Sequence, residues 1–363
     1  MFYIPLKILA RLALKLYCRN IHHSGISLLH QPGPLLIASN HPNSFLDAIV
    51  IASHCRKKTY ILVRGDVFKN KWADYFLRRL YCIPIYRLSE GRQLMDRNEI
   101  TFSRCLEIFK KGRNVLIFCE GNCENEWKLR ALGKGAARLA FLGWGQPEIR
   151  DRLRMVPVGL TYQNFDRVGK KMFFMTGEML SKKMFTEESP AKALSHFNLI
   201  LRERLNKLIL HVPPDHHSVS RFQSLMENTA IKRKEGALSL PEIQREINVT
   251  ATDDVGAALP GKSAKRRIPW WRIIGYPLSW AGWLLHAPLY YPLKSLAKKK
   301  TANSVFYDSV LFGLLFLTYP LYLILLAAVL FLLTKNDGCC LILVAAPILA
   351  FIALQYAPSK KLT

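Results

Sequence analysis

Between residues 33 and 165 the hydrophobic pattern alternates between short strand-like runs and longer amphipathic segments. The strand-like runs are LLIAS, TYILVR, CIPIYR, VLIFCEG and MVPVGLTY, and helical periodicity marks 92–111 and 134–143. Strands that alternate with helices predict an α/β domain with a mostly parallel sheet covered by helices. Residues 170–233 continue with another apolar run, KKMFFMTGEML, and a helical pattern around 190–211.

Each of the five strand-like runs ends in polar or charged residues. These residues are Asn40 with His41, Arg64, Arg87, Glu120 and Tyr162. Ligands of parallel α/β sheets gather at the carboxyl ends of the strands. The shared placement therefore indicates a single site at one edge of the predicted sheet.

Basic residues recur at every fourth position near the N-terminus, at Lys7, Arg11, Lys15 and Arg19, and large apolar side chains fill most other positions. This spacing keeps the cations on one helical face. Apolar bulk with a basic stripe is typical of a helix lying in the membrane interface. We expect residues 1–24 to form such a helix; an amphipathic helix packed on the globular domain is the alternative.

Three C-terminal runs, 273–293, 309–334 and 338–359, contain no Asp, Glu, Lys or Arg. About 20 apolar residues are enough to span a bilayer, so the last two runs predict a transmembrane hairpin. Lysines at 298–300 and 360–361 flank this hairpin, and basic flanks place both of its ends in the cytoplasm. The first run contains three prolines and suits a re-entrant or interfacial segment as well as a span.

These patterns divide the chain into four parts. They are the interface helix 1–24, a globular domain 25–233, a polar and basic linker 234–268 and membrane segments 269–363. We therefore expect an integral membrane protein of the cytoplasmic, inner-membrane or endoplasmic-reticulum type, with its globular domain facing the cytoplasm.

The chain is strongly basic, with 52 Lys and Arg against 26 Asp and Glu and a formal net charge of +26. Such an excess indicates an acidic partner, which is a nucleic acid, an anionic membrane or a phosphorylated substrate. The basic residues are scattered and no nucleic-acid-binding motif occurs, so we expect a phospholipid membrane and no nucleic acid. The eight cysteines form no zinc-ligand array, which predicts no metal site and reduced thiols.

The stretch SNHPNSFLD places His41 on a loop before a helix that starts near Ser44, with Asp47 in that helix. Two interpretations remain open at this level. Ser44-x-x-Asp47 matches a capping box, in which Asp47 only stabilises the helix start. Alternatively, the loop brings His41 back over the first helical turn to form a catalytic pair with Asp47.

A second stretch, FCEGNCENEWKLRALGKGAARLA, follows the fourth strand-like run. It delivers Glu120 and Gly121 into a loop, and Lys134 opens a small-residue helix whose N-terminal amides could hold an anion. Taken alone, Glu120 could equally be a solvated carboxylate in a turn.

Together these segments resemble a known family. NHPNSFLD, IPIYR, FCEG with LGKGAARLA, and VPVGLTY are similar, in order and rough spacing, to the four motif blocks of the glycerolipid acyltransferases. That family includes glycerol-3-phosphate and 1-acylglycerol-3-phosphate (lysophosphatidic acid) acyltransferases. The resemblance covers residues 40–162 and implies a glycerol-3-phosphate acyltransferase-like α/β fold.

The resemblance implies roles for individual residues. His41 matches the general base that acts on the acceptor hydroxyl, and Asp47 matches the aspartate that orients it. Five residues separate the two, where four are common in the family, and this longer spacing resembles the glycerol-3-phosphate acyltransferase-like branch. A second departure is Cys119, which stands where the family usually has a proline.

The remaining matches concern substrate binding. Arg87 matches an arginine that binds the acceptor's phosphate, Glu120 and Gly121 match a pair associated with acceptor binding, Lys134 resembles the lysine that follows that block, and Pro157 matches a proline associated with the acyl-donor side. Arg64, at the end of its own strand, is a further candidate phosphate ligand; a surface salt bridge is the alternative. Backbone amides near His41 are candidate donors to the oxyanion.

The expected activity is O-acyl transfer from acyl-CoA or acyl-carrier protein to glycerol 3-phosphate or 1-acylglycerol 3-phosphate in phospholipid biosynthesis. Another lysophospholipid or an aminolipid is the alternative acceptor, and a basic membrane-anchored nucleic-acid-binding protein is a remote alternative of another class. Beyond the thioester co-substrate, we expect no cofactor.

Overall fold

A computed structural model describes residues 3–87, 91, 93, 96–186, 189–228, 240–248, 270–301 and 304–356, without the side chains of 270–274 and 337. The chain divides into two compact units. Unit 1 comprises 1–8, 22–161 and 173–212; unit 2 comprises 9–21, 162–172 and 213–363.

A seven-stranded sheet in the order β1-β7-β6-β2-β5-β3-β4 forms the centre of the fold. The strands are β1 (Cys18–Ser24), β2 (Leu35–Ser39), β3 (Thr59–Arg64), β4 (Cys82–Ile85), β5 (Asn114–Phe118), β6 (Arg154–Tyr162) and β7 (Lys170–Thr176). β2 pairs in parallel with β5 and β6, and β3 pairs in parallel with β4 and β5. The predicted α/β fold with a mostly parallel sheet is therefore confirmed.

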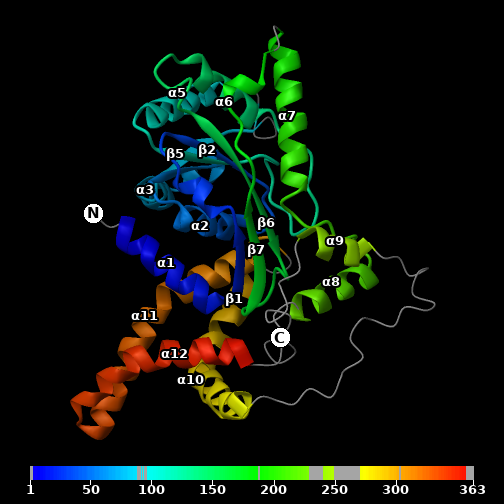
Figure 1. The fold of residues 1–363 in the computed structure, drawn as a ribbon. Coiled ribbons are helices and arrows are strands. Elements are labelled where there is room, and N and C mark those ends of the chain that lie inside the picture. Colours follow the sequence, from blue (N-terminus) through cyan, green and yellow to red (C-terminus); the bar gives the residue numbers. More distant parts are fainter. Residues whose placement is uncertain are drawn as a thin grey trace, which may run out of the picture. The chain divides into compact units, whose positions relative to one another are not determined.

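Helices cover the sheet. In unit 1 they are α2 (Ser44–His54), α3 (Lys71–Arg79), α5 (Arg97–Lys110), α6 (Gly135–Gly145) and α7 (Pro190–Asn206), with 3-10 turns η1 (Ile26–His30), η2 (Gly65–Lys69) and η4 (Lys182–Met184). Figure 1 shows α5, α6 and α7 gathered beside one end of the sheet. Every residue of β2 is buried because this central strand is covered on both faces.

The register aligns the carboxyl ends of the central strands. Ser39, the last residue of β2, lies opposite Phe118 of β5 and Val158 of β6. The segments that follow β2 and β5 therefore begin at the same edge of the sheet. This is the geometric condition that a shared site at the strand ends requires.

The N-terminal prediction is wrong in one respect. The helix α1 covers Tyr3–Tyr17, and Cys18–Ser24 forms the edge strand β1 and not the end of a helix over 1–24. The sequence CRNIHHS has no helical apolar period, and its exposure rises toward its end, as an edge strand allows. β4 ends at Ile85, before the predicted end at Arg87, because the Asn98 side chain binds both backbone groups of Tyr86 and holds that residue outside the strand. α5 begins at Arg97, and parts of the predicted helical segment 92–111 lie outside the described residues.

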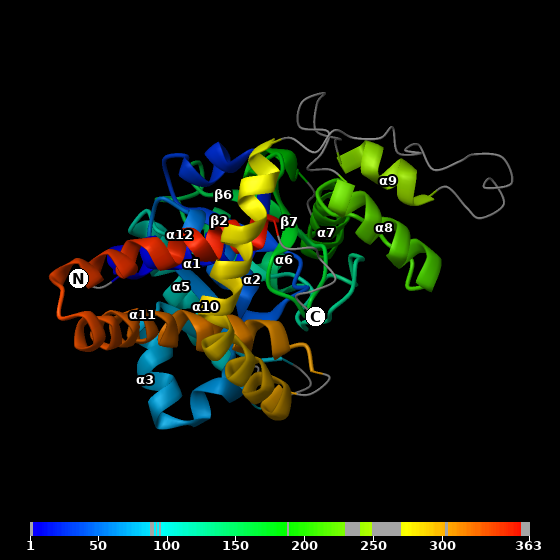
Figure 2. The same ribbon diagram turned by 90° about the horizontal axis from the view of Figure 1, so that it is seen from below.

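Unit 2 contains most of the remaining helices. They are α8 (His216–Asn228), α9 (Leu240–Asn248), α10 (Trp270–Thr301), α11 (Tyr307–Thr334), the turn η7 (Asp337–Leu341) and α12 (Ile342–Tyr356). Figure 2 shows α10 crossing α11 and α12, and α10 packs against both. The predicted linker 234–268 contains the helix α9, and its other residues lie outside the described part of the chain.

Two described segments, Tyr307–Thr334 and Gly338–Tyr356, are long and apolar enough to cross a membrane by length and composition. They coincide with the predicted hairpin, and Lys335, in the left-handed conformation, ends α11 between them. The run 273–293 lies within α10, which continues through Pro277, Pro288 and Pro292. The helix is continuous at all three prolines, and the position of this segment in a membrane stays a prediction.

A buried ion pair lies inside unit 2. The ammonium of Lys170, the first residue of β7, binds the carboxylate of Asp308 in the first turn of α11, and their side chains are 0% and 1% exposed. The Tyr17 hydroxyl donates to Asp308 Oδ1 over 2.5 Å. Burial, followed by the Asp308 carboxylate, raises the pKa of Tyr17 well above its usual value, so the hydroxyl keeps the proton it donates.

We predict that Lys170→Met lowers the free energy of unfolding by about 3–5 kcal/mol, because it leaves a buried carboxylate without a counter-charge. Lys170→Met combined with Asp308→Asn should recover most of this loss, since the amide is neutral and still accepts from Tyr17. Denaturant unfolding of the detergent-solubilised protein measures both. Equal stability of the single and double variants would contradict the ion pair.

Candidate active site

The loop between β2 and α2 carries His41 and is pinned at its base by Asn40. The Asn40 amide donates to the Leu160 carbonyl over 2.9 Å, and the Leu160 N–H donates to Asn40 Oδ1 over 2.8 Å. Asn40 is buried. This paired contact with β6 fixes where the chain leaves β2, and so fixes the origin of the His41 loop.

His41 and Asp47 are in direct contact. His41 Nδ1 lies 2.8 Å from Asp47 Oδ2, and their side chains are 18% and 0% exposed. Because a carboxylate only accepts, Nδ1 carries the proton, and in the neutral ring the lone pair is on Nε2. The imidazole is thus held in the tautomer that a general base requires.

Asp47 also stabilises the start of α2. Its Oδ2 accepts the N–H of Asn43, the residue before the helix, over 2.8 Å. The two interpretations of the sequence are therefore compatible, because one carboxylate binds the helix start and the imidazole together. The longer spacing between His41 and Asp47 is accommodated where the loop enters α2, whose first residue, Ser44, has a positive φ of 50°.

The ring of Phe118, the last residue of β5, fixes the plane of the imidazole. The two ring centroids lie 3.8 Å apart and the rings are inclined by only 11°. A stacked aromatic neighbour limits rotation of the imidazole and partly excludes water from it. β5 therefore contributes to the site through Phe118 as well as through the loop that follows.

Glu120 holds the main chain of His41. Its Oε2 accepts the His41 N–H over 3.1 Å, and the same carboxylate binds the N–H and guanidinium of Arg130 over 3.0 and 2.8 Å. The Glu120 side chain is 2% exposed, so it is not the solvated turn carboxylate that one interpretation of the sequence allowed. In this structure Glu120 acts as a clamp between the His41 loop and Arg130.

Two arginines converge on the loop after β5. Arg87 Nη1 donates to the Asn122 side-chain oxygen, and Arg130 Nη2 donates to the Asn122 carbonyl. Neither Arg130 nor Asn122 was predicted from the sequence. A signal for Arg130 existed, because a buried Glu120 requires a cationic partner and Arg130 lies within the same block.

Cys119 explains how the loop is held without the proline that the family usually has there. Its N–H donates to the Ser39 carbonyl over 2.9 Å, a bond that proline cannot make, and its carbonyl accepts the Gly133 N–H over 2.7 Å. Gly121 has a φ of +73°, a conformation that glycine adopts without strain. Hydrogen bonds to two neighbouring segments thus replace the rigidity of a proline ring.

Cys123 lies beside the pair of His41 and Asp47 but is unsuited to nucleophilic attack. Its Sγ accepts the Ser44 N–H over 2.9 Å. Burial, with the Asp47 charge as the next cause, raises the pKa of the thiol to about 12. The reactive species of cysteine is the thiolate, so Cys123 stays protonated and unreactive near neutral pH.

The other candidate residues are placed differently. Arg64 is exposed and pairs with Asp66. This pair is the surface salt bridge that the sequence allowed as the alternative to a phosphate ligand. Pro157 is buried in β6 opposite Ala38, and the exposed Lys134 precedes α6, next to the Gly133 contact. The structure therefore joins His41, Asp47 and Glu120 by direct contacts and brings Arg87 to the loop after Glu120 through Asn122. Arg64, Lys134 and Pro157 are not among the residues that make these contacts. Within the described ranges, no group of His, Cys, Asp or Glu could hold a metal ion.

A comparison with protein-family models shows which family the segment around this site resembles. Residues 20–161 match the family model described as Acyltransferase. This segment is a domain of the acyltransferase family. The match contains the His41–Asp47 pair and the Glu120 clamp, and for residues 20–161 it confirms the predicted acyltransferase family.

Other comparisons add little to the acyltransferase assignment. The solved structures include the 1-acyl-sn-glycerophosphate (LPA) acyltransferase PlsC from Thermotoga maritima, at 14% identity and a TM-score of 0.39. The alignment covers 55% of this chain and 77% of PlsC. Among curated proteins, no match was found.

We predict that Arg130→Met destabilises the protein by about 3–5 kcal/mol, because it leaves the buried Glu120 carboxylate without its cation. Arg64→Met is the matched control, since it removes an arginine from an exposed pair with Asp66, and it should cost at most about 1 kcal/mol. Thermal and denaturant unfolding compare the two. Equal losses would show that Glu120 is not clamped as described.

Proposed function

We propose that this acyltransferase moves a fatty acyl group from a thioester donor, acyl-CoA or acyl-carrier protein, to a hydroxyl of glycerol 3-phosphate or 1-acylglycerol 3-phosphate. The observation that carries the proposal is the 2.8 Å contact of His41 Nδ1 with the buried Asp47. It leaves Nε2 as the basic nitrogen of a partly exposed imidazole, inside the segment that matches the acyltransferase family.

The chemistry needs a base more than a nucleophile. The thioester carbonyl is already activated, while the acceptor alcohol must lose its proton as it attacks. Nε2 of His41 takes this proton, and a positioned base contributes roughly 10²–10⁴-fold to the rate. Asp47 stabilises the imidazolium that forms. The acceptor oxygen adds to the thioester carbonyl carbon to give a tetrahedral intermediate. When this intermediate collapses, the carbon–sulfur bond breaks and the imidazolium returns the proton to the departing thiolate.

The oxyanion of the tetrahedral intermediate also needs donors. The backbone N–H groups of His41, Asn43 and Ser44 are engaged by Glu120, Asp47 and Cys123, and Pro42 has none. The expectation that amides near His41 bind the oxyanion is therefore not supported. Donors from another segment, or from the bound substrates, would have to supply this stabilisation.

A phosphorylated acceptor suits the cations around Asn122. The guanidinium groups of Arg87 and Arg130 both reach this loop. Arginine binds phosphate oxygens through a planar fork of donors. Arg87 is half-buried and lies at the carboxyl end of β4, on the edge where β2 delivers His41. These features support an acceptor that presents its phosphate to Arg87 and its hydroxyl to His41.

We further propose that the protein is integral to a phospholipid membrane, with the acyltransferase domain in the cytoplasm. The two apolar segments of the C-terminal region support membrane insertion. All eight cysteines are free thiols and five of them are buried, which suits a reducing compartment. A membrane location would give the enzyme access to lipid acceptors and to its lipid product.

An acceptor screen with radiolabelled acyl-CoA and acyl-carrier protein tests the reaction. Wild-type protein should acylate glycerol 3-phosphate or 1-acylglycerol 3-phosphate, and His41→Ala should lose at least about 10²-fold in rate because the base is gone. The screen includes other lysophospholipids and an aminolipid. Acyl transfer to one of these lipids alone would show that the proposed acceptor is wrong. A fully active His41→Ala variant would overturn the mechanism.

We predict that Arg87→Ala raises the KM for the phosphorylated acceptor by about tenfold or more, since a charge-assisted bond to a phosphate contributes roughly 1.5–3 kcal/mol. The KM for the acyl donor should change little. Arg64→Ala, at an exposed pair, serves as the control in steady-state kinetics. An unchanged acceptor KM would contradict the phosphate role of Arg87.

A further inference from the structure

The helix α3 of unit 1 buries none of its nine side chains. It follows the turn η2 after β3 and exposes an unusual set of large apolar residues. Their exposed fractions are 43% for Val67, 74% for Trp72, 49% for Tyr75, 57% for Phe76 and 43% for Leu80. We call this set the α3 face. A short helix in water usually buries its apolar stripe against the domain. The exposed stripe of α3 therefore indicates a contact with a partner outside the domain.

The apolar side chains of α3 are arranged as one stripe. Trp72, Phe76 and Leu80 follow each other at intervals of four, and Tyr75 lies beside them at an interval of three from Trp72. Residues at these intervals are neighbours on a helix surface. Contiguous exposed apolar patches mark interaction sites for proteins, ligands or membranes.

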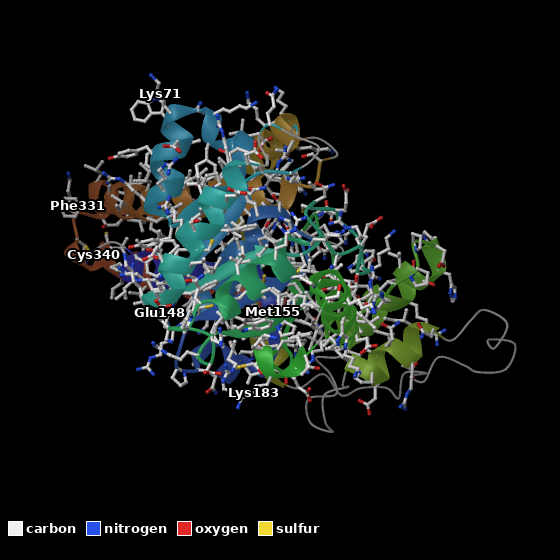
Figure 3. All side chains as sticks on the ribbon, turned by 90° about the horizontal axis from the view of Figure 1, so that it is seen from above. Lys71, Glu148, Met155, Lys183, Phe331 and Cys340 are labelled. Carbon is white, nitrogen blue, oxygen red and sulfur yellow. The ribbon has the colours of Figure 1, made fainter. Side chains whose placement is uncertain are left out.

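Basic residues border the stripe. From residue 64 to residue 80 the chain has five basic and two acidic residues. Asp74 is paired with Arg78, and the guanidinium of Arg79 lies over the Tyr75 ring at 4.1 Å. Lys69 and Lys71 are exposed, and Figure 3 shows the Lys71 side chain pointing away from the ribbon. The border therefore carries a net positive charge.

Local contacts fix the position of α3 on the domain. Asn70 caps the helix, since its Oδ1 accepts the N–H groups of Trp72 and Ala73 over 2.9 and 3.3 Å. At the start of η2, Gly65 is so close to the Tyr86 ring that an added Cβ would lie 2.2 Å from it. Tyr86 directly precedes Arg87, so the turn η2, which leads into α3, is fixed at the edge of the sheet that carries the active site.

We propose that the α3 face docks on the surface of an anionic lipid bilayer and sets the active-site edge of the domain against it. Trp and Tyr are the residues enriched at membrane interfaces, and basic residues near such a surface are attracted by anionic lipids. A second copy of the chain would present the same basic border, and like charges facing each other oppose association, so the border favours an anionic lipid surface over a second copy. The contact does not depend on the proposed reaction and is tested without substrate.

The test places an environment-sensitive fluorophore on the full-length protein in vesicles. Phe76→Cys labels the α3 face, and Leu199→Cys on α7 is the matched control, because the two side chains are 57% and 56% exposed. The background carries Cys339→Ser and Cys340→Ser. The raised pKa of Cys123, about 12, keeps that thiol unlabelled near neutral pH.

In vesicles of phosphatidylcholine and phosphatidylglycerol that contain a nitroxide lipid, the label at position 76 should emit at shorter wavelength and be quenched more than the label at position 199. Equal quenching at the two positions would overturn the proposal. A blue shift at position 76 that grows with protein density without nitroxide quenching would also overturn it, since a second copy would then cover the face.

A charge reversal tests the choice of an anionic surface. Lys69→Glu with Lys71→Glu should lower the quenching at position 76, because each basic residue near such a surface changes a local binding constant by about fivefold. Lys192→Glu with Lys207→Glu, two exposed lysines at α7, is the control and should have no effect. Equal effects of the two pairs, or equal quenching in pure phosphatidylcholine, would overturn the anionic docking.

Discussion

The hydrogen bond between His41 Nδ1 and Asp47 is the interaction on which the rest of the site depends. Asp47 is buried at the start of α2 and accepts the Asn43 N–H as well as the imidazole. A buried carboxylate with two donors is a fixed acceptor, and it therefore determines both the tautomer and the direction of the imidazole. Phe118 fixes the plane of that ring, and Glu120 fixes the backbone that carries it.

Asp47 and Glu120 hold different parts of His41, although the family resemblance associates Glu120 with acceptor binding. Asp47 binds the side chain of His41, while Glu120 accepts the main-chain N–H of His41 and is itself held by Arg130. The loop after β5 is then a support for the base as well as a place where Arg87 and Arg130 meet. A membrane contact through the α3 face would add a third element on the same edge of the sheet, so that base, cations and lipid surface meet where parallel strands end.

The sequence predicted the features that rest on local pattern and on the ends of parallel strands. The strand runs, the pairing of His41 with Asp47 and the position of Arg87 and Glu120 at one edge follow from these rules. Three features depend on tertiary contacts that no local pattern encodes. Arg130 is recognisable only once Glu120 is known to be buried, Cys18–Ser24 is a strand only because β7 is beside it, and α3 is identified by the absence of buried side chains.

The most direct test of the central claim is a kinetic double-mutant cycle with Asp47→Asn and His41→Ala. Asp47→Asn keeps an acceptor for the Asn43 N–H but no longer selects the tautomer of His41. We therefore expect kcat/KM to fall by about 10⁴-fold, which is the size of the loss that the same Asp→Asn change causes in a Ser-His-Asp triad. Because the two residues act as a unit, the double variant should be no slower than His41→Ala alone. Losses that add on a logarithmic scale would contradict the account, since His41 and Asp47 would then act independently.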